Sequence, residues 1–325
     1  MKTVFLLFLV LGLNLLCGTR GNAQTTDSFK HDVPIVPCWA KGDTFDYDIS
    51  KTRLDSSNTS VPKKSEQRFL ARITIIDSTD SSYRLEYYRI ADFPPALLAD
   101  SIPTDIRQKI QELAQIKITY ETNETGIVSE ILNQEDLQEK IDQDYHSLLE
   151  LMNVEDRHPN LTAIIEDFMS SFSAETLINM YAQDIYALHY GLGYEWNTQD
   201  TIDFEEELLA PILNVPITAN GIFYCNHYDA ENNLISLREE KRIVGDYKQD
   251  ILNFLQQYET ETNPISREEF QKLDMNIHIQ NTYAYNNRWG IPRLVELHKA
   301  INVSVGKEVL HRTEIYRIEL RTNLP

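Results

Sequence analysis

The sequence predicts an α+β fold, in which a large curved antiparallel sheet of meandering hairpins carries a helical middle segment packed on one face. Toward both ends of the chain, apolar residues alternate with polar ones, which is the period of a strand with one buried face. In the middle, apolar residues recur every three or four positions, as in an amphipathic helix. We therefore expect a single α+β domain over residues 41–325, with a helical insertion at about 134–192.

Residues 1–24 have the features of a secretory signal peptide. Lys2 precedes an apolar run, and the small residues Gly21 and Ala23 stand where a signal peptidase cleaves. The run is shorter than the roughly 20 residues of a membrane span. Leu16 before Cys17 does not fit a lipidation site. We expect an exported protein, periplasmic, on the outer surface or extracellular, with residues 25–40 as an N-terminal arm and no transmembrane segment.

The first half of the domain is expected to form hairpins around a short helix. The alternating apolar residues place strands near residues 44–49, 69–75, 83–87, 116–120 and 127–132. A polar loop is expected at 55–64, and a helix capped by Thr104 at 105–115.

The middle and second half continue with helices and then strands. Helices are expected at 133–152 and 161–188, followed by an acidic surface crossing at 195–207. Further strands are expected near 211–217, 223–227, 234–243, 275–285 and 295–305, with a helix at 248–258. After a turn at 306–307, a last strand is expected to carry Tyr316, Ile318 and Leu320 on one face. Because both halves read as hairpin, short helix and hairpin, two like modules in one sheet are one interpretation, and chance similarity is the other.

The charge and the two cysteines outside the expected signal limit the partners and the redox state. A formal net charge of −20 disfavours nucleic acid and anionic membrane surfaces, because both require a basic face. Cys38 and Cys225 are separated by most of the domain. Export permits a disulfide between them, and two free thiols are the alternative.

Motifs of known catalytic or metal chemistry are absent from the sequence. It contains no GxSxG, HExxH, CxxC or glycine-rich phosphate loop. His146 and Glu150 share a helix face, but a zinc site needs at least three converging ligands. We therefore expect no metal and no cofactor, and we assign no catalytic residue from the sequence.

Aromatic residues are the candidates for a binding pocket. Tyrosines on strands usually border a sheet core with their hydroxyls at its rim. The sharper interpretation is an amphipathic cavity, and its candidate lining residues are Tyr47, Tyr87, Tyr120, Tyr283, Tyr285, Phe168 and Phe172.

Short sequence features resemble uncharacterised exported proteins of Gram-negative bacteria. These features are the Asn-Ala-Gln end of the signal, the Lys41-Gly-Asp-x-Phe-x-Tyr47 strand and the closing Tyr283-x-Tyr…Gly-x-Pro292 hairpin. The meanders with helices on one face resemble, more loosely, the LolA-like periplasmic carriers. That resemblance covers the strand-rich ends but not the larger helical middle. It implies an open barrel that holds acyl chains, and it transfers no functional residue.

The function expected from these observations is binding of an apolar or amphipathic small molecule, such as a lipid, or of a lipoprotein-like ligand, without catalysis. Two alternatives stay open. A structural or protein-binding envelope component would show an exposed apolar patch or a bare sheet edge. A secreted hydrolase would show two carboxyl groups within catalytic range in a cleft.

Overall fold

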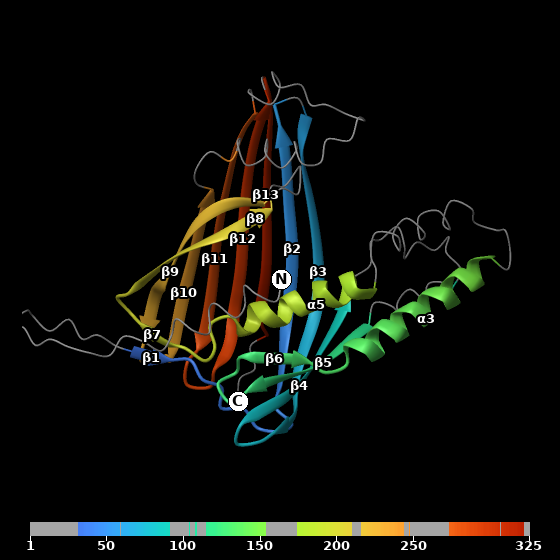
Figure 1. Ribbon diagram of the computed structural model, residues 1–325, viewed down its shortest axis with the longest axis vertical. Coiled ribbons are helices and arrows are strands. Elements are labelled where there is room, and N and C mark those ends of the chain that lie inside the picture. The colour runs from blue at the N-terminus through green and yellow to red at the C-terminus, as the bar shows by residue number, and fades with distance from the viewer. Residues whose placement is uncertain are drawn as a thin grey trace, which may run out of the picture. The chain divides into compact units, whose positions relative to one another are not determined.

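The computed structural model describes residues 32–58, 60–91, 104, 108, 115–153, 174–209, 216–243, 247, 273–305 and 307–321. Within these residues the chain forms an eleven-stranded antiparallel sheet, a two-stranded sheet and two long helices (Figure 1). The expected large antiparallel sheet is therefore confirmed. The expected signal peptide, Phe168, Phe172 and the helix at 248–258 lie outside the described residues, as does most of the helix at 105–115.

The large sheet consists of two meanders that join at its centre. The first meander contains β2 (Thr44–Ser57), β3 (Ser60–Ser78), β4 (Ser82–Ala91), β5 (Gln115–Asn123) and β6 (Val128–Ile131). The second contains β8 (Thr201–Leu209), β9 (Pro216–Asp229), β10 (Leu234–Ile243), β11 (Leu273–Asn286), β12 (Ile291–Val305) and β13 (Glu308–Leu320). The strand order is β6-β5-β4-β3-β2-β13-β12-β11-β10-β9-β8. The pairing of β13 with β2 therefore brings the two ends of the domain together.

Two segments that were expected to be irregular are strands. Residues 55–64 continue β2 and β3 almost to their turn, where Ser57 pairs with Ser60. Alternation marks a strand only where one face is buried, and the described side chains of this hairpin end are exposed or half-buried. The expected acidic crossing at 195–207 is also wrong, because it forms β7 (Glu195–Asn197) and most of β8. In β8, half-buried Phe204 alternates with exposed acidic residues, as in an edge strand.

The described part of the N-terminal arm, residues 32–40, belongs to the folded structure. Its strand β1 (Asp32–Pro34) pairs with β7. Val33, Ile35 and Trp39 are buried in the main core. Beyond β1, the Ile35 N–H donates to the Tyr194 carbonyl at 3.1 Å, and the Cys38 N–H donates to the Trp289 carbonyl at 3.2 Å.

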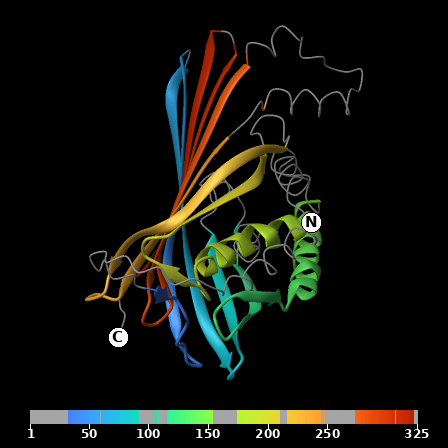
Figure 2. The same cartoon turned by 60° about the vertical axis from the view of Figure 1, so that its left-hand side comes forward.

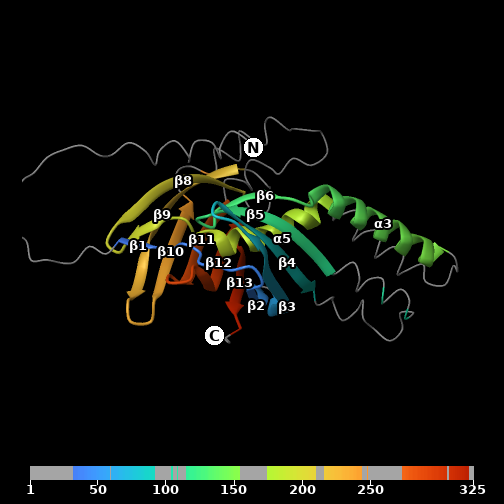
Figure 3. The same ribbon diagram turned by 90° about the horizontal axis from the view of Figure 1, so that it is seen from below.

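The helix α5 (Ala174–His189) lies on the concave side of the curved sheet, whereas α3 (Gln134–Asn153) extends away from the side of the sheet where β5 and β6 lie (Figures 2 and 3). We call the concave side the inner face. The buried residues Ile178, Ala182, Ile185 and Leu188 recur at helical spacing and place one side of α5 against the sheet. Among the described helices, none is both long and apolar enough to cross a membrane.

Candidate ligand-binding surface

The five tyrosines expected to line a pocket come together on the inner face of the sheet. Tyr47, Tyr87, Tyr120, Tyr283 and Tyr285 are between 0 and 4% exposed and belong to one core cluster that includes residues of α5. The Tyr283 hydroxyl donates to Glu239 on β10, and the Tyr47 hydroxyl has no partner among the described residues. The hydroxyls of Tyr87 and Tyr120 bond to residues of α5, and that of Tyr285 bonds to the turn that follows it. These tyrosines therefore form the contact between the sheet and this helix.

Asp184 on α5 is the centre of a buried polar contact that the sequence did not reveal. The Tyr87 hydroxyl donates to its Oδ2 at 2.6 Å, and Arg89 Nη1 donates to the same oxygen at 2.7 Å. The Tyr316 hydroxyl donates to Oδ1. Burial, together with the Asp184 charge, raises the pKa of Tyr87 well above its ordinary value. The available signal was an acidic residue on the apolar stripe of the helix, where an isolated charge is costly unless it is paired.

The C-terminal end of α5 is fixed by two further polar contacts. His189 Nδ1 lies 2.7 Å from the Gly126 carbonyl oxygen, which can only accept, so Nδ1 carries the proton. Nε2 then accepts from the Tyr120 hydroxyl at 3.0 Å. Burial lowers the pKa of His189 to about 4. Beyond the helix, the Gly191 N–H donates to the Tyr285 hydroxyl at 2.9 Å.

A second polar group, which we call the Glu239 cluster, joins the inner face of β8, β10 and β11 to the turn after α5. It consists of Tyr190, Glu206, Glu239, Lys241, Asn281 and Tyr283. Lys241 Nζ lies 2.8 Å from Glu206 and 3.1 Å from Glu239. Asn281 Nδ2 donates to Glu239 Oε2 at 2.5 Å, and the Tyr190 hydroxyl donates to Oε1 at 3.0 Å. Glu239 is buried. Lys241 supplies the opposite charge, and Asn281 and Tyr190 supply the hydrogen bonds, that a buried carboxylate requires.

Beyond this cluster, the inner face carries a separate apolar surface. This distal apolar surface consists of Ile217, Met275, Ile277, Ile301 and Val303, with Leu208, Ile243, Tyr247 and Ile279 packed against it. The first five are no more than 5% exposed. No described residue of α3 or α5 belongs to it. Tyr247 contacts it from outside the strands, and its hydroxyl accepts from the Met275 N–H at 2.7 Å.

The inner face changes from apolar to charged between β12 and β13. Ile301 on the distal apolar surface pairs with Arg312 on β13, which pairs in turn with Asp55 on β2. Asp55 accepts hydrogen bonds from Arg312 Nε and from Arg53 Nε, both at 2.7 Å. The hydrogen bond from Arg312 is the main cause that lowers the pKa of Asp55 below its ordinary value. Apolar and charged groups therefore lie side by side on one surface.

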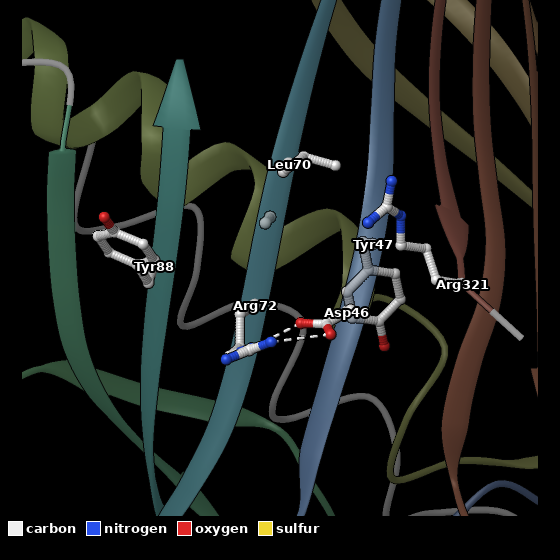
Figure 4. A pocket seen from close by; sticks show the side chains of 7 residues that line it. Asp46, Tyr47, Leu70, Arg72, Tyr88 and Arg321 are labelled. Atoms are coloured by element: carbon white, nitrogen blue, oxygen red, sulfur yellow. Dashed lines mark hydrogen bonds and ion pairs between the residues drawn. The ribbon is translucent and has the colours of Figure 1, made fainter. Parts of the chain in front are cut away.

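A small pocket of about 190 Å³ lies on the opposite face of the sheet (Figure 4). Its lining residues are Asp46, Tyr47, Leu70, Ala71, Arg72, Tyr88 and Arg321. Arg72 donates to both oxygens of Asp46 at 2.6 and 2.9 Å, which lowers the pKa of Asp46. Arg321 donates to Asp48 at 2.9 Å. Because its charges are paired within the sheet, this pocket offers no specific recognition group for a ligand.

The cysteines and the metal-ligating residue types form no site in the described part of the chain. Cys38 is free and exposed, whereas Cys225 is free and half-buried. The Cys225 thiol lies 3.6 Å from the His227 carbonyl oxygen. Among the described residues, no group of three histidine, cysteine or acidic side chains is placed to hold a metal ion.

Comparisons with known proteins find only distant structural similarity. No family model and no curated protein matches the sequence. A structure of lipovitellin, solved for its lipid–protein interactions, is similar over 87% of this chain with 11% identity and a TM-score of 0.40. This chain spans 25% of the lipovitellin chain.

Two further solved structures come from bacteria. Ail, the attachment invasion locus protein of Yersinia pestis, matches over 87% of this chain and 100% of its own, with 4% identity and a TM-score of 0.16. OmpF of Salmonella typhi, in a complex with daunomycin, matches over 85% and 98%, with 7% identity and a TM-score of 0.21. Similarities this low support no conclusion about what the chain binds.

Proposed function

We propose that the protein binds an apolar or amphipathic ligand, such as the acyl chain of a lipid or lipoprotein, on the distal apolar surface, and that it does so without catalysis. The observation that carries this proposal is the separation of that surface from the core beneath α5. Its central residues are buried, and the half-buried Leu208, Ile243 and Ile279 at its margin are the apolar contacts that it offers to a ligand. Each buried methylene contributes about 0.8 kcal/mol, so a chain of about ten methylenes gains roughly 8 kcal/mol before ordering costs.

The border between apolar and charged residues supports an amphipathic ligand. Ile301 and Val303 lie on the apolar side of this border, and Arg312 and Asp55 lie on the adjoining strands of the same face. An acyl chain fits the first group, and a polar headgroup fits the second or the Glu239 cluster.

In this proposal, the five inner-face tyrosines have a different role from the pocket lining expected from the sequence. Tyr87 and Tyr120 use their hydroxyls to hold α5, and Tyr285 holds the turn after it. The ligand then lies beyond them, at the distal end of β9 to β12. Phe168 and Phe172 stay candidates from the sequence alone.

Export is part of the same proposal, because a lipid-binding protein with a signal-like N-terminus would act outside the cytoplasm. Mass spectrometry of the protein from a bacterial secretion host tests it. We expect the mature chain to begin near Gln24 or Thr25. An intact N-terminus in the exported fraction would contradict cleavage.

Binding is tested with a dansyl-labelled dodecyl chain and the delipidated protein. We expect the wild type to bind the probe. Replacing Ile279, which is half-buried at the margin of the distal apolar surface, by serine should weaken binding by about tenfold or more, since burying one isoleucine is worth about 1.5–3 kcal/mol. Native mass spectrometry before delipidation should show a co-purified ligand.

The matched control is Ile315→Ser on the outer face of β13, which should leave probe binding unchanged. Because Ile279→Ser removes packing as well, the milder Ile279→Thr is measured beside it, and urea unfolding is followed for each variant. If the wild type binds no probe, or if the inner-face and outer-face variants lose binding equally, the proposal is wrong.

A further inference from the structure

We infer that the Glu239 cluster is the headgroup site of this ligand and that it selects a headgroup with positive charge and N–H donors, such as a primary amine. The inference rests on the proposed function and adds the chemical class of the ligand. It depends on three features of the cluster: its position, its charge and one buried acceptor.

The position of the cluster matches a headgroup site. Asn281 lies two residues from Ile279 on β11, and both face inward because side chains alternate along a strand. Lys241 pairs directly with Ile279 in the register of β10 and β11. An alkyl chain that contacts Ile279 thus ends roughly 7 Å from Asn281, given a rise of about 3.4 Å per residue.

The charge of the cluster favours a cation. Glu206 and Glu239 both contact Lys241, so two carboxylates share one ammonium group. The cluster has a net charge of −1 when all three groups are ionised. In a partly buried site this charge attracts a cation more strongly than in water, because the effective dielectric constant is lower. An anionic headgroup would instead meet two carboxylates.

One buried acceptor in the cluster has no donor among the described residues. Asn281 is only 7% exposed, and its side-chain amide nitrogen donates to Glu239. This fixes the orientation of the amide and leaves its Oδ1 buried without a hydrogen bond. Buried acceptors are nearly always paired. An N–H group of the ligand would supply the missing donor.

The cluster can be reached from the edge of the sheet. Glu206 lies on the edge strand β8, and its side chain is 31% exposed. Tyr190, which donates to Glu239, is 45% exposed. A headgroup can therefore approach Glu206 and Lys241 at this edge while α5 stays in place.

The test compares ligands that share the same dodecyl chain and differ in their headgroups. Dodecylamine, dodecanoate and dodecyl maltoside compete with the dansyl-labelled dodecyl probe for binding to the full-length protein at neutral pH, where the amine is protonated. We expect dodecylamine to bind about tenfold more tightly than dodecanoate. Glu206→Gln, at the exposed margin of the cluster, and Asn281→Leu should each remove most of this preference. Gln280→Leu, on the outer face of the same strand, should keep it.

The outcomes separate the two proposals. If every dodecyl ligand binds with equal affinity, or if dodecanoate binds best, the headgroup inference is wrong while ligand binding stands. If no dodecyl ligand binds, the proposed function itself is wrong. If the amine preference survives in Glu206→Gln and in a folded Asn281→Leu protein, the cation is recognised elsewhere and the assignment of the Glu239 cluster is wrong.

Discussion

Arg89 on β4 and Asp184 on α5 form a buried ion pair, in which Nη1 lies 2.7 Å from Oδ2 and the two side chains are 6% and 3% exposed. Two tyrosine hydroxyls donate to the same carboxylate. The residues come from segments 95 positions apart in the sequence. Their contact therefore depends on α5 being docked on the sheet, and it stabilises that docking in return.

Removing the Asp184 charge should be one of the most destabilising polar substitutions in the described part of the protein. In Asp184→Asn, the Arg89 guanidinium stays buried without its carboxylate, which typically costs about 3–5 kcal/mol. Urea unfolding monitored by circular dichroism measures this loss. Asp46→Asn, which breaks the exposed pair with Arg72, should cost at most about 1 kcal/mol. Equal losses in the two variants would show that the buried pair has no special role.

Two tyrosines of the inner face should respond oppositely to loss of the hydroxyl group. The Tyr285 hydroxyl accepts from the Gly191 N–H, so Tyr285→Phe leaves a buried donor unpaired and should cost about 1–3 kcal/mol. The Tyr47 hydroxyl is buried without a hydrogen-bond partner among the described residues. Tyr47→Phe should therefore be neutral or stabilising in the same urea measurement. A larger loss in Tyr47→Phe than in Tyr285→Phe would refute the described hydrogen bonding.

His189 should make the protein less stable as the pH falls from about 6.5 to about 4. Its folded pKa of about 4 lies below the ordinary value of 6.5, because burial disfavours the charged ring. In this window the unfolded protein binds a proton that the folded protein does not. The contribution of neutral His189 to the free energy of unfolding is therefore fully present above pH 6.5 and is lost as the pH falls. The full effect is about 3 kcal/mol.

The measurement for His189 is the free energy of unfolding at several pH values. His189→Gln keeps a polar side chain without a titrating group, so its profile should be flatter than that of the wild type between pH 6.5 and 4. Carboxylates with lowered pKa values, such as Asp46 and Asp55, lose their contribution only at lower pH. Parallel profiles for wild type and variant would contradict the assignment of this dependence to His189.

Sequence patterns identified the parts of the sheet where one face is buried. Phe45, Tyr47 and Ile49 alternate with polar residues in β2, and the inward orientation of that side follows directly from the period. The distal halves of β2 and β3 lack this contrast, because solvent reaches both faces. Leu54 is exposed there. No apolar stripe therefore marked this part of the hairpin as a strand.

The order of the strands and the polar contacts could not be predicted from local patterns. The pairing of β13 with β2 joins the first and last long strands, and nothing in either strand specifies the other. Asp184 and Arg89 are unremarkable charges in their own segments until α5 docks. The tyrosines were placed on the correct face of the sheet, but the roles of their hydroxyls depend on the position of that helix.

A final prediction concerns Gly290, in the turn between β11 and β12. Its φ of +61° lies in the left-handed region, and a Cβ atom there would approach Pro37 Cα to 2.5 Å and Pro37 N to 2.6 Å. Backbone atoms cannot move aside as a flexible side chain can, so Gly290→Ala should displace the N-terminal arm. The arm contributes Val33, Ile35 and Trp39 to the core. Its displacement should therefore destabilise the protein by more than the roughly 1–2 kcal/mol that backbone strain alone costs.

Limited proteolysis of the arm separates this displacement from strain alone. Gly42 also has a positive φ, of +96°, but a Cβ atom there meets nothing within 4 Å. Gly42→Ala should therefore lose stability through backbone strain while the arm stays protected from cleavage. Gly290→Ala should expose the arm near Pro37, because the contact that excludes a protease is the one that the new methyl group disrupts. Equal protection in both variants would mean that the arm is held by β7 and the core without the turn at Gly290.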